Sequence, residues 1–221
     1  MVIAIDGPGG VGKSTVARRV ASSRGLAYLD TGATYRAAAL AALRSGGDLG
    51  DSSAVIAAVA VAVIEYSDGA IFLDGEDVST EIRTPQATSA SSAVAAIPEV
   101  RRIVVAMQRK WVEARAGKAV VEGRDIGTVV FPEAELKIFL TARPEVRAAR
   151  RAGDPEADGA AVTEIHAALE KRDHADSTRQ VSPLRPAPDA FVIDTSDMAL
   201  DAVITEVLGE VDRIANRPRL L

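Results

Sequence analysis

Residues 7–15, GPGGVGKST, combine glycines, a lysine and hydroxyl side chains in a spacing that suits the binding of phosphate groups. The pattern Gly7-x4-Gly12-Lys13-Ser14 is a Walker A pattern, and it lies between a strand predicted over residues 2–6 and a helix predicted over residues 13–23. Glycines let successive backbone N–H groups turn toward one anion, and the helix N-terminus adds its positive dipole end. Lys13 would reach the β- and γ-phosphates, and the Ser14 hydroxyl would ligate Mg²⁺. We therefore predict a nucleoside triphosphate site formed by Gly7, Pro8, Gly9, Gly10, Val11, Gly12, Lys13, Ser14 and Thr15.

This loop alone does not define a reaction, because GTPases, transport ATPases, helicases and small-molecule kinases all carry it. A GTPase would add the guanine-reading pattern Asn-Lys-x-Asp after a strand, and the sequence contains none. A kinase needs in addition a second pocket for the group that accepts the phosphate, and a mobile cover that carries arginines.

Two segments are candidates for the second pocket. In LDTGATYR, residues 29–36, the side chains of Thr31, Tyr35 and Arg36 suit a monophosphate, although Thr31 acting as a helix cap and Tyr35 as a packing residue is an equal alternative. In EGRDIG, residues 122–127, Arg124 and Asp125 follow a strand at its carboxyl end, where open α/β sheets bind their ligands. Gly123 would allow a ligand to approach the backbone closely; the alternative for Arg124 and Asp125 is pairing with other loops.

The candidate cover begins at residues 143–153, where Arg147, Arg150 and Arg151 occupy positions i, i+3 and i+4 of a predicted helix. Such a stripe is ordinarily a solvated face, but here the polar segment GDPEADGA follows it, as a closing lid would require. Further along, residues 171–184 gather two acids and two arginines near a helix end, which suits either a capping network or a ribose phosphate; these residues are Arg172, Asp173, Asp176 and Arg179.

The elements that would position these residues form an α/β pattern. Buried strands are predicted over residues 2–6, 26–30, 118–123, 136–141 and 190–194, alternating with helices over 13–23, 32–44, 52–61, 85–96, 98–115, 143–153, 162–173 and 199–215. Continuous apolar strands joined by helices predict a five-stranded parallel sheet with helices on both faces. Residues 61–79 differ, because β-rich runs separated by Ser67-Asp68-Gly69 and Asp74-Gly75 predict a small antiparallel insertion.

Composition limits the class of protein. Of the 221 residues 48% are hydrophobic and only 4% aromatic, which agrees with a core of small aliphatic residues. The absence of cysteine excludes disulfides and thiolate chemistry, and a net charge of −5 does not indicate a nucleic-acid or membrane surface. Because Met1 directly precedes the first strand and no apolar run would span a bilayer, we expect a cytoplasmic protein without a signal peptide.

These stretches together resemble the bacterial cytidylate kinase family, which belongs to the nucleoside monophosphate kinases among the P-loop kinases. The matching segments are IDGPGGVGKST, LDTGATYR, DGEDVSTEIRT, VVEGRDIGTVVFP, KIFLTA, RAARR and KRD…D…R…SPL, in order from residue 3 to about residue 195. The resemblance implies ATP- and Mg²⁺-dependent phosphorylation of CMP and dCMP to the diphosphates. We expect a monomer that binds no nucleic-acid polymer and no membrane. It also implies a P-loop core (residues 1–61, 99–142 and 161–221), a CMP-binding insert (62–98) and a lid (143–160).

The resemblance further implies a role for each matching residue. Thr31, Tyr35, Arg36 and Arg124 would handle the acceptor phosphate; Ser92, Arg109 and Asp125 would read the base; Gly123 lies beside them; Arg172, Asp176 and Arg179 would surround the sugar. Catalysis would depend on Lys13, Arg124, Arg147, Arg150 and Arg151. The lid segment 153–160 matches the family poorly, and a kinase of another small acceptor (UMP, shikimate or gluconate) or a nucleotide-dependent conformational switch remains the alternative.

Overall fold

The computed structural model describes residues 1–67, 69–154 and 159–216. The chain forms two compact units, one made of Met1–Tyr28 with Arg115–Leu221 and the other of Leu29–Ala114. Residue 68 of the predicted Ser67-Asp68-Gly69 turn and residues 155–158 of the predicted lid lie outside the described residues. The division into core, insert and lid remains a prediction.

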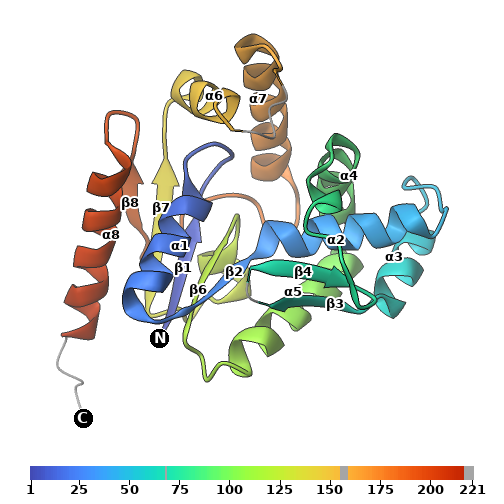
Figure 1. Cartoon of the computed structure of the whole chain (residues 1–221), viewed down its shortest axis with the longest axis horizontal. Coiled ribbons are helices and arrows are strands. Elements are labelled where there is room, and N and C mark those ends of the chain that lie inside the picture. Colours follow the sequence, from blue (N-terminus) through green and yellow to red (C-terminus); the bar gives the residue numbers. More distant parts are fainter. Residues whose placement is uncertain (68, 155–158, 217–221) are drawn as a thin grey trace. The chain divides into compact units, whose positions relative to one another are not determined.

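The first unit is built on a five-stranded parallel sheet, as predicted (Figure 1). Its strands are β1 (Val2–Asp6), β2 (Ala27–Asp30, which crosses the boundary between the units), β6 (Ala119–Gly123), β7 (Leu136–Thr141) and β8 (Phe191–Asp194). They lie in the order β2-β6-β1-β7-β8, so β1 is central and pairs in parallel with β6 on one side and β7 on the other. The carboxyl ends of β1 and β6 therefore meet at one edge, where Asp6 aligns with Gly123.

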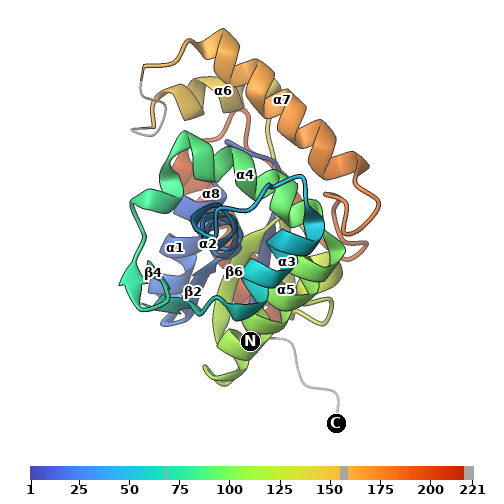
Figure 2. The ribbon, with the colours of Figure 1, turned by 90° about the vertical axis from the view of Figure 1, so that its right-hand side faces the viewer.

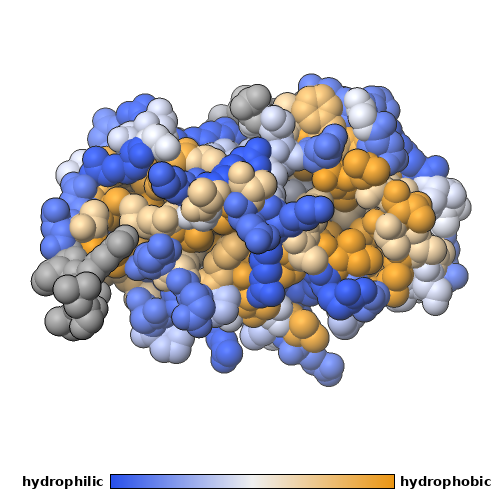
Figure 3. All heavy atoms as spheres, turned by 90° about the horizontal axis from the view of Figure 1, so that it is seen from below, coloured by the Kyte–Doolittle hydropathy of each residue, from blue (hydrophilic) through white to orange (hydrophobic). Residues whose placement is uncertain are grey.

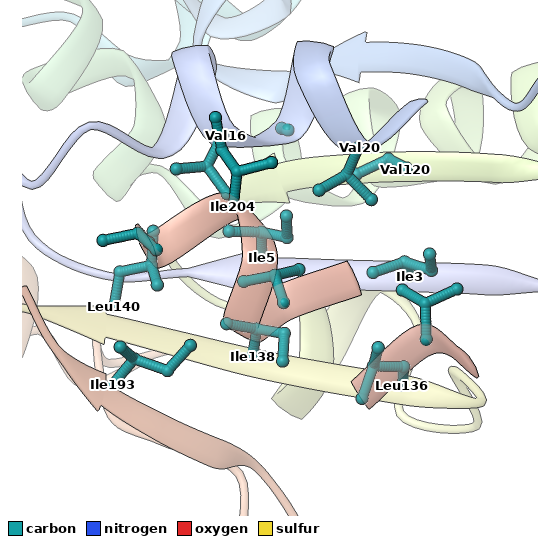
Figure 4. Close-up of a cluster of buried hydrophobic side chains, with 14 of the residues drawn as sticks. Ile3, Ile5, Val16, Val20, Val120, Leu136, Ile138, Leu140, Ile193 and Ile204 are labelled. Atoms are coloured by element: carbon teal, nitrogen blue, oxygen red, sulfur yellow. The ribbon is translucent and has the colours of Figure 1, made fainter. Parts of the chain in front are cut away.

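Helices α1 (Lys13–Arg24) and α8 (Leu200–Ala215) cover one face of this sheet and bury its aliphatic side chains. Helices α6 (Pro144–Ala152) and α7 (Val162–Thr178) pack against each other, and a short π-type turn, η2, lies at Ile126–Val130. Figure 4 shows Val16 and Val20 of α1 and Ile204 of α8 packed with Ile3 and Ile5 of β1 in one core. Because side chains alternate along a strand, Asp6 lies on the opposite face of β1 from Ile3 and Ile5, and there it contacts η2.

Helix α7 is longer than the sequence predicts. It continues to Thr178 instead of ending at residue 173, because no glycine or proline interrupts the chain before Pro183. As a result Arg172, Asp173 and Asp176 all lie on one helix, rather than at a helix end.

The second unit is mostly helical and has its own core. Its elements are α2 (Thr31–Arg44), α3 (Ser52–Val61), β3 (Ile64–Ser67), β4 (Ala70–Leu73), β5 (Glu76–Asp77), the 3-10 turn η1 (Glu81–Arg83), α4 (Pro85–Ala96) and α5 (Pro98–Glu113). The three short strands form the predicted antiparallel sheet. Figure 2 views α2 along its axis, with α3, α4 and α5 around it; their small side chains, such as Ala38, Ala42 and Val94, form the core.

Local signals in the sequence explain the ends of these elements. The side chains of Asp30, Asp51 and Thr84 accept N–H bonds in the first turns of α2, α3 and α4. At the turn between β4 and β5, Asp74 and Gly75 both have positive φ, 53° and 83°, which is the geometry that Asp-Gly predicts for a tight hairpin.

Large apolar side chains at the surface are scattered. Among the described residues the exposed ones are Val61, Val63, Val162, Val181, Val192 and Leu200. Figure 3 shows apolar surface interrupted by hydrophilic residues on one face. No helix in the described ranges is both long enough and apolar enough to cross a membrane.

Candidate active site

The phosphate loop joins β1 to α1 in a conformation that requires glycine. The φ angles of Gly7, Gly10 and Gly12 are 150°, 78° and 88°. A Cβ atom at Gly7 would lie 2.2 Å from the carbonyl oxygen of Leu140, and one at Gly10 would lie 2.8 Å from that of Arg147. Helix α1 begins at Lys13, and the residue before it is Gly12. Because glycine has no side chain, no cap side chain accepts a hydrogen bond from the first N–H groups of the helix. This is a cradle that suits an anion.

Lys13 lies inside this loop, where its Nζ atom donates a hydrogen bond of 2.7 Å to the carbonyl oxygen of Pro8. Desolvation and the nearby charge of Arg124 lower the pKa of Lys13 to about 7, and Glu122 and Asp6 oppose that shift only in part. A phosphate group bound in the loop would favour the charged ammonium, because it adds negative charge close to Nζ.

Arg124 connects the phosphate loop to helix α7. Its Nη1 donates to the carbonyl oxygen of Gly7 at 2.6 Å, and its Nε donates to Oδ2 of Asp176 at 2.8 Å. Asp176 also lies 3.6 Å from Nη1 of Arg179 and 4.0 Å from Nε of Arg172. The structure thus brings together residues that are far apart in the sequence, with three guanidinium groups around one carboxylate.

Asp125 belongs to the same cluster and is almost completely buried, with 3% of its surface exposed. Its Oδ1 lies 3.8 Å from Nη2 of Arg179. The guanidinium groups of this cluster suit an anionic ligand, while the buried carboxylate of Asp125 suits a hydrogen-bond donor.

Asp6 is a site-facing residue that the sequence analysis missed. Its carboxylate accepts hydrogen bonds from the backbone N–H groups of Ile126 and Gly127 at 2.8 and 2.7 Å. Burial raises the pKa of Asp6 to about 6, although these two bonds act in the opposite direction. The available signal was a carboxylate placed directly between an apolar strand and the first glycine of the loop.

The three predicted lid arginines do not act as one stripe. Arg147 is buried; its Nη1 donates to the carbonyl oxygen of Gly9 at 3.1 Å, and it forms an ion pair with Asp173 of α7. Arg150 bonds the backbone oxygen and the hydroxyl of Thr195 at 2.6 and 2.8 Å, and Arg151 pairs with Asp154 at 3.0 Å. Arg147 therefore lies beside the phosphate loop.

The start of α2 answers part of the question about Thr31. Asp30, not Thr31, is the cap, because its carboxylate accepts from the N–H of Ala33 at 2.9 Å; the capping alternative for Thr31 was wrong. Asp30 also accepts from Nη2 of Arg36 at 3.1 Å, which orients that guanidinium. Thr31 is buried as the first residue of the helix, one turn before Tyr35.

Beside Tyr35 lies an arginine that the sequence analysis did not select. The guanidinium of Arg101 stacks over the Tyr35 ring at 5.2 Å and is 4% exposed, whereas Arg109 lies on the exposed side of the same helix, α5. The period of the helix carries the signal, because Val104, Gln108 and Val112 continue the buried face that Arg101 begins. Ser92 is half-buried on α4.

A glycine-rich loop between the central strand of a parallel sheet and a helix, with Lys13 inside it and Arg124 bonded to its first glycine, defines a P-loop kinase. A model of the family described as cytidylate kinase matches residues 3–213. The chain belongs to the cytidylate kinase family.

Curated relatives agree with this family. The chain is 50% identical to the cytidylate kinase of Corynebacterium efficiens over 98% of this chain and 96% of that protein. It is 51% identical to the cytidylate kinase of Mycobacterium leprae over 96% of this chain and 95% of that protein. Among solved structures, an uncharacterized protein from Eubacterium ventriosum has a similar fold, with a TM-score of 0.53 and 14% identity over 96% of this chain and 98% of that one.

Proposed function

We propose that this protein transfers the γ-phosphoryl group of ATP to CMP or dCMP, giving ADP and CDP or dCDP. The observation that carries the proposal is the bond between Arg124 and the carbonyl oxygen of Gly7, which joins the phosphate loop to the GRD segment. It supports the proposal because a phosphoryl transferase must hold the donor phosphates and the acceptor phosphate next to each other.

On the donor side, the N–H groups of the loop and of the first turn of α1 bind the triphosphate together with Lys13. The uncapped start of α1 and the close backbone packing at Gly7 and Gly10 fit such an anion. Ser14 offers the hydroxyl that would hold Mg²⁺, which neutralises charge on the donor phosphates when it is bound.

On the acceptor side, we propose that Thr31, Tyr35, Arg36 and Arg124 bind the phosphate of CMP. Ser92, Arg109 and Asp125 would bind the base, and Arg172, Asp176 and Arg179 the sugar, with Gly123 allowing close approach. We add Arg101 to the proposed acceptor site, because its guanidinium lies over the Tyr35 ring and is buried, whereas Arg109 is exposed.

Selection of cytosine follows from hydrogen-bond chemistry. Cytosine presents an amino donor at N4 and acceptors at N3 and O2, whereas uracil presents an acceptor at O4 and a donor at N3. The Asp125 carboxylate accepts from the amino group but would oppose the O4 of uracil. Because Asp125 is buried, water cannot relieve that opposition.

The transfer itself needs no general base, because the acceptor is already a phosphate anion at neutral pH. The protein's part is to align the two nucleotides and to neutralise the charge that develops on the transferred group. We assign that part to Lys13, Arg124 and the three lid arginines; to reach a phosphate, Arg147 must exchange its bond to Gly9 for one to the nucleotide.

The test is a panel of acceptors. ADP release from Mg·ATP is measured with no acceptor and then with CMP, dCMP, UMP, AMP and shikimate, and the products are identified by mass spectrometry. We expect release that depends on CMP or dCMP and yields the diphosphate. Release without an acceptor would support a nucleotide-operated switch, and release with shikimate alone would support a different kinase.

Two further expectations accompany the proposal. We expect the enzyme to act in the cytoplasm, where both of its substrates are found. We also expect a monomer, and light scattering on the purified protein would test this.

A further inference from the structure

The turn η2 (Ile126–Val130) has an unusual cap. Asp125 occupies the residue before the turn with φ −142° and ψ 25°, outside the extended conformation of an ordinary N-cap, and its side chain forms no cap bond. Asp6 takes that place from the end of β1: its Oδ1 accepts from Ile126 at 2.8 Å and its Oδ2 accepts from Gly127 at 2.7 Å. One of the two N–H groups open to Asp125 is therefore already bonded.

The contact depends on both oxygens of the carboxylate. Asp6 is 5% exposed, so water cannot replace either bond. Gly127 has no side chain to keep the two backbones apart, and a Cβ atom there would lie 3.4 Å from Oδ2 of Asp6 and 3.1 Å from Cδ of Lys137. An asparagine at position 6 would present one acceptor and one NH₂ group, and the NH₂ group would face an N–H.

We propose that Asp6 is a positioning residue for base selectivity: by capping η2 it leaves the Asp125 carboxylate in place to accept the amino group of cytosine. This inference rests on the proposed function. Asp125 instead points toward Arg179, at 3.8 Å, inside the arginine cluster. Because Asp6 directly precedes Gly7, the same side chain also ties the start of the phosphate loop to the segment that carries Arg124.

Loss of the cap would then act through Asp125. With the N–H of Gly127 left without its acceptor, the side chain of Asp125, two residues earlier in the chain, would turn to bond it. The enzyme would keep its Asp125 but lose the contact by which it prefers CMP to UMP.

The test compares Asp6→Asn with Asp51→Asn. Asp51 is a control for the change from Asp to Asn at a helix start in the second unit: its carboxylate also accepts two backbone N–H groups, from Ser53 at 2.9 Å and Ala54 at 3.2 Å, but both bonds go to Oδ1, which asparagine retains. For each variant kcat/KM is measured with CMP and with UMP, together with KM for ATP. We expect D6N to lower the ratio of kcat/KM for CMP to that for UMP at least about fivefold, which a change in ATP binding alone would not do because it acts equally on both acceptors, and we expect D51N to leave the ratio as it is.

A double variant separates positioning from stability. If Asp6 acts through Asp125, D6N combined with Asp125→Asn has the same selectivity as D125N alone, whereas independent effects would multiply. An unchanged ratio in D6N, or multiplied effects, would overturn the inference.

If D6N does not fold, Asp6→Ser is tested in the same comparison at lower temperature. Failure of both variants to fold would also overturn the inference, because Asp6 would then serve stability alone.

The wild-type protein tells the two proposals apart. If it makes no CDP, the proposed function fails; if it prefers CMP and D6N keeps that preference, only the role of Asp6 fails.

Discussion

Replacing Asp125 by alanine should remove most of the preference for CMP over UMP. Asp125 is 3% exposed, so the O4 atom of uracil would meet a carboxylate without water between them. An unrelieved pair of acceptors of this kind costs about 1–3 kcal/mol. Since about 1.4 kcal/mol is tenfold in rate, Asp125 should contribute a factor of about 5 to 150 to the ratio of the two kcat/KM values.

The assay follows ADP release at saturating ATP over a range of CMP and of UMP concentrations. Asp125→Ala should lower kcat/KM for CMP and bring the ratio toward one. Asp125→Asn should do so with higher activity toward UMP than Asp125→Ala, because an amide can donate to O4 as well as accept from N4. If kcat/KM falls equally for both nucleotides, Asp125 supports the structure of the site but does not read the base, and the reasoning above is refuted.

Three other predictions concern single residues. Lys13→Ala should lower kcat at least about 100-fold while calorimetry finds CMP binding nearly unchanged, because the ammonium acts on the transferred group; near-normal turnover would contradict this role. Arg101→Met should lower the free energy of unfolding in urea by about 2 kcal/mol through loss of the cation–π contact with Tyr35, and Arg109→Met by less than about 0.5 kcal/mol; equal effects would contradict the assignment. The pKa of Asp6 is about 6 in the folded protein against an ordinary 3.8, so the folded state binds the carboxyl proton more tightly than the unfolded state does. The stabilisation that comes from this proton is present at low pH and is lost as the pH rises through 6. Wild type should therefore gain about 1 kcal/mol over D6N between pH 7 and pH 5 in urea unfolding, and a constant difference would show that Asp6 does not titrate there.

Most of the fold could be predicted because its signals are local. Continuous apolar runs mark strands such as β7, whose bounds match the prediction, and cap residues such as Asp51 mark helix starts. The end of α7 could not be found in this way: the acids at its C-terminal end indicated a capping network, but nothing there stops a helix.

The candidate site could be predicted where the position along a strand or loop selects the residue. Arg124 and Asp125 follow a strand whose end must meet the loop, and the structure brings Arg124 to Gly7. The resemblance implies Arg109, whereas the helical period buries Arg101 and exposes Arg109. Asp6 was missed because its partners are backbone N–H groups 120 residues away, and no side-chain pattern records them.

The order of the strands has a consequence for synthesis of the protein. The strand at the middle of the sheet, β1, leaves the ribosome first, but its neighbours β6 and β7 follow more than a hundred residues later. During that interval the residues of α2–α5 can collapse around their own alanine-rich core. Strand β1 meanwhile has no partner strand, and its apolar side chains are exposed to solvent or to a chaperone. The strand that leads into the phosphate loop therefore lacks both of its partner strands until β6 and β7 have been made.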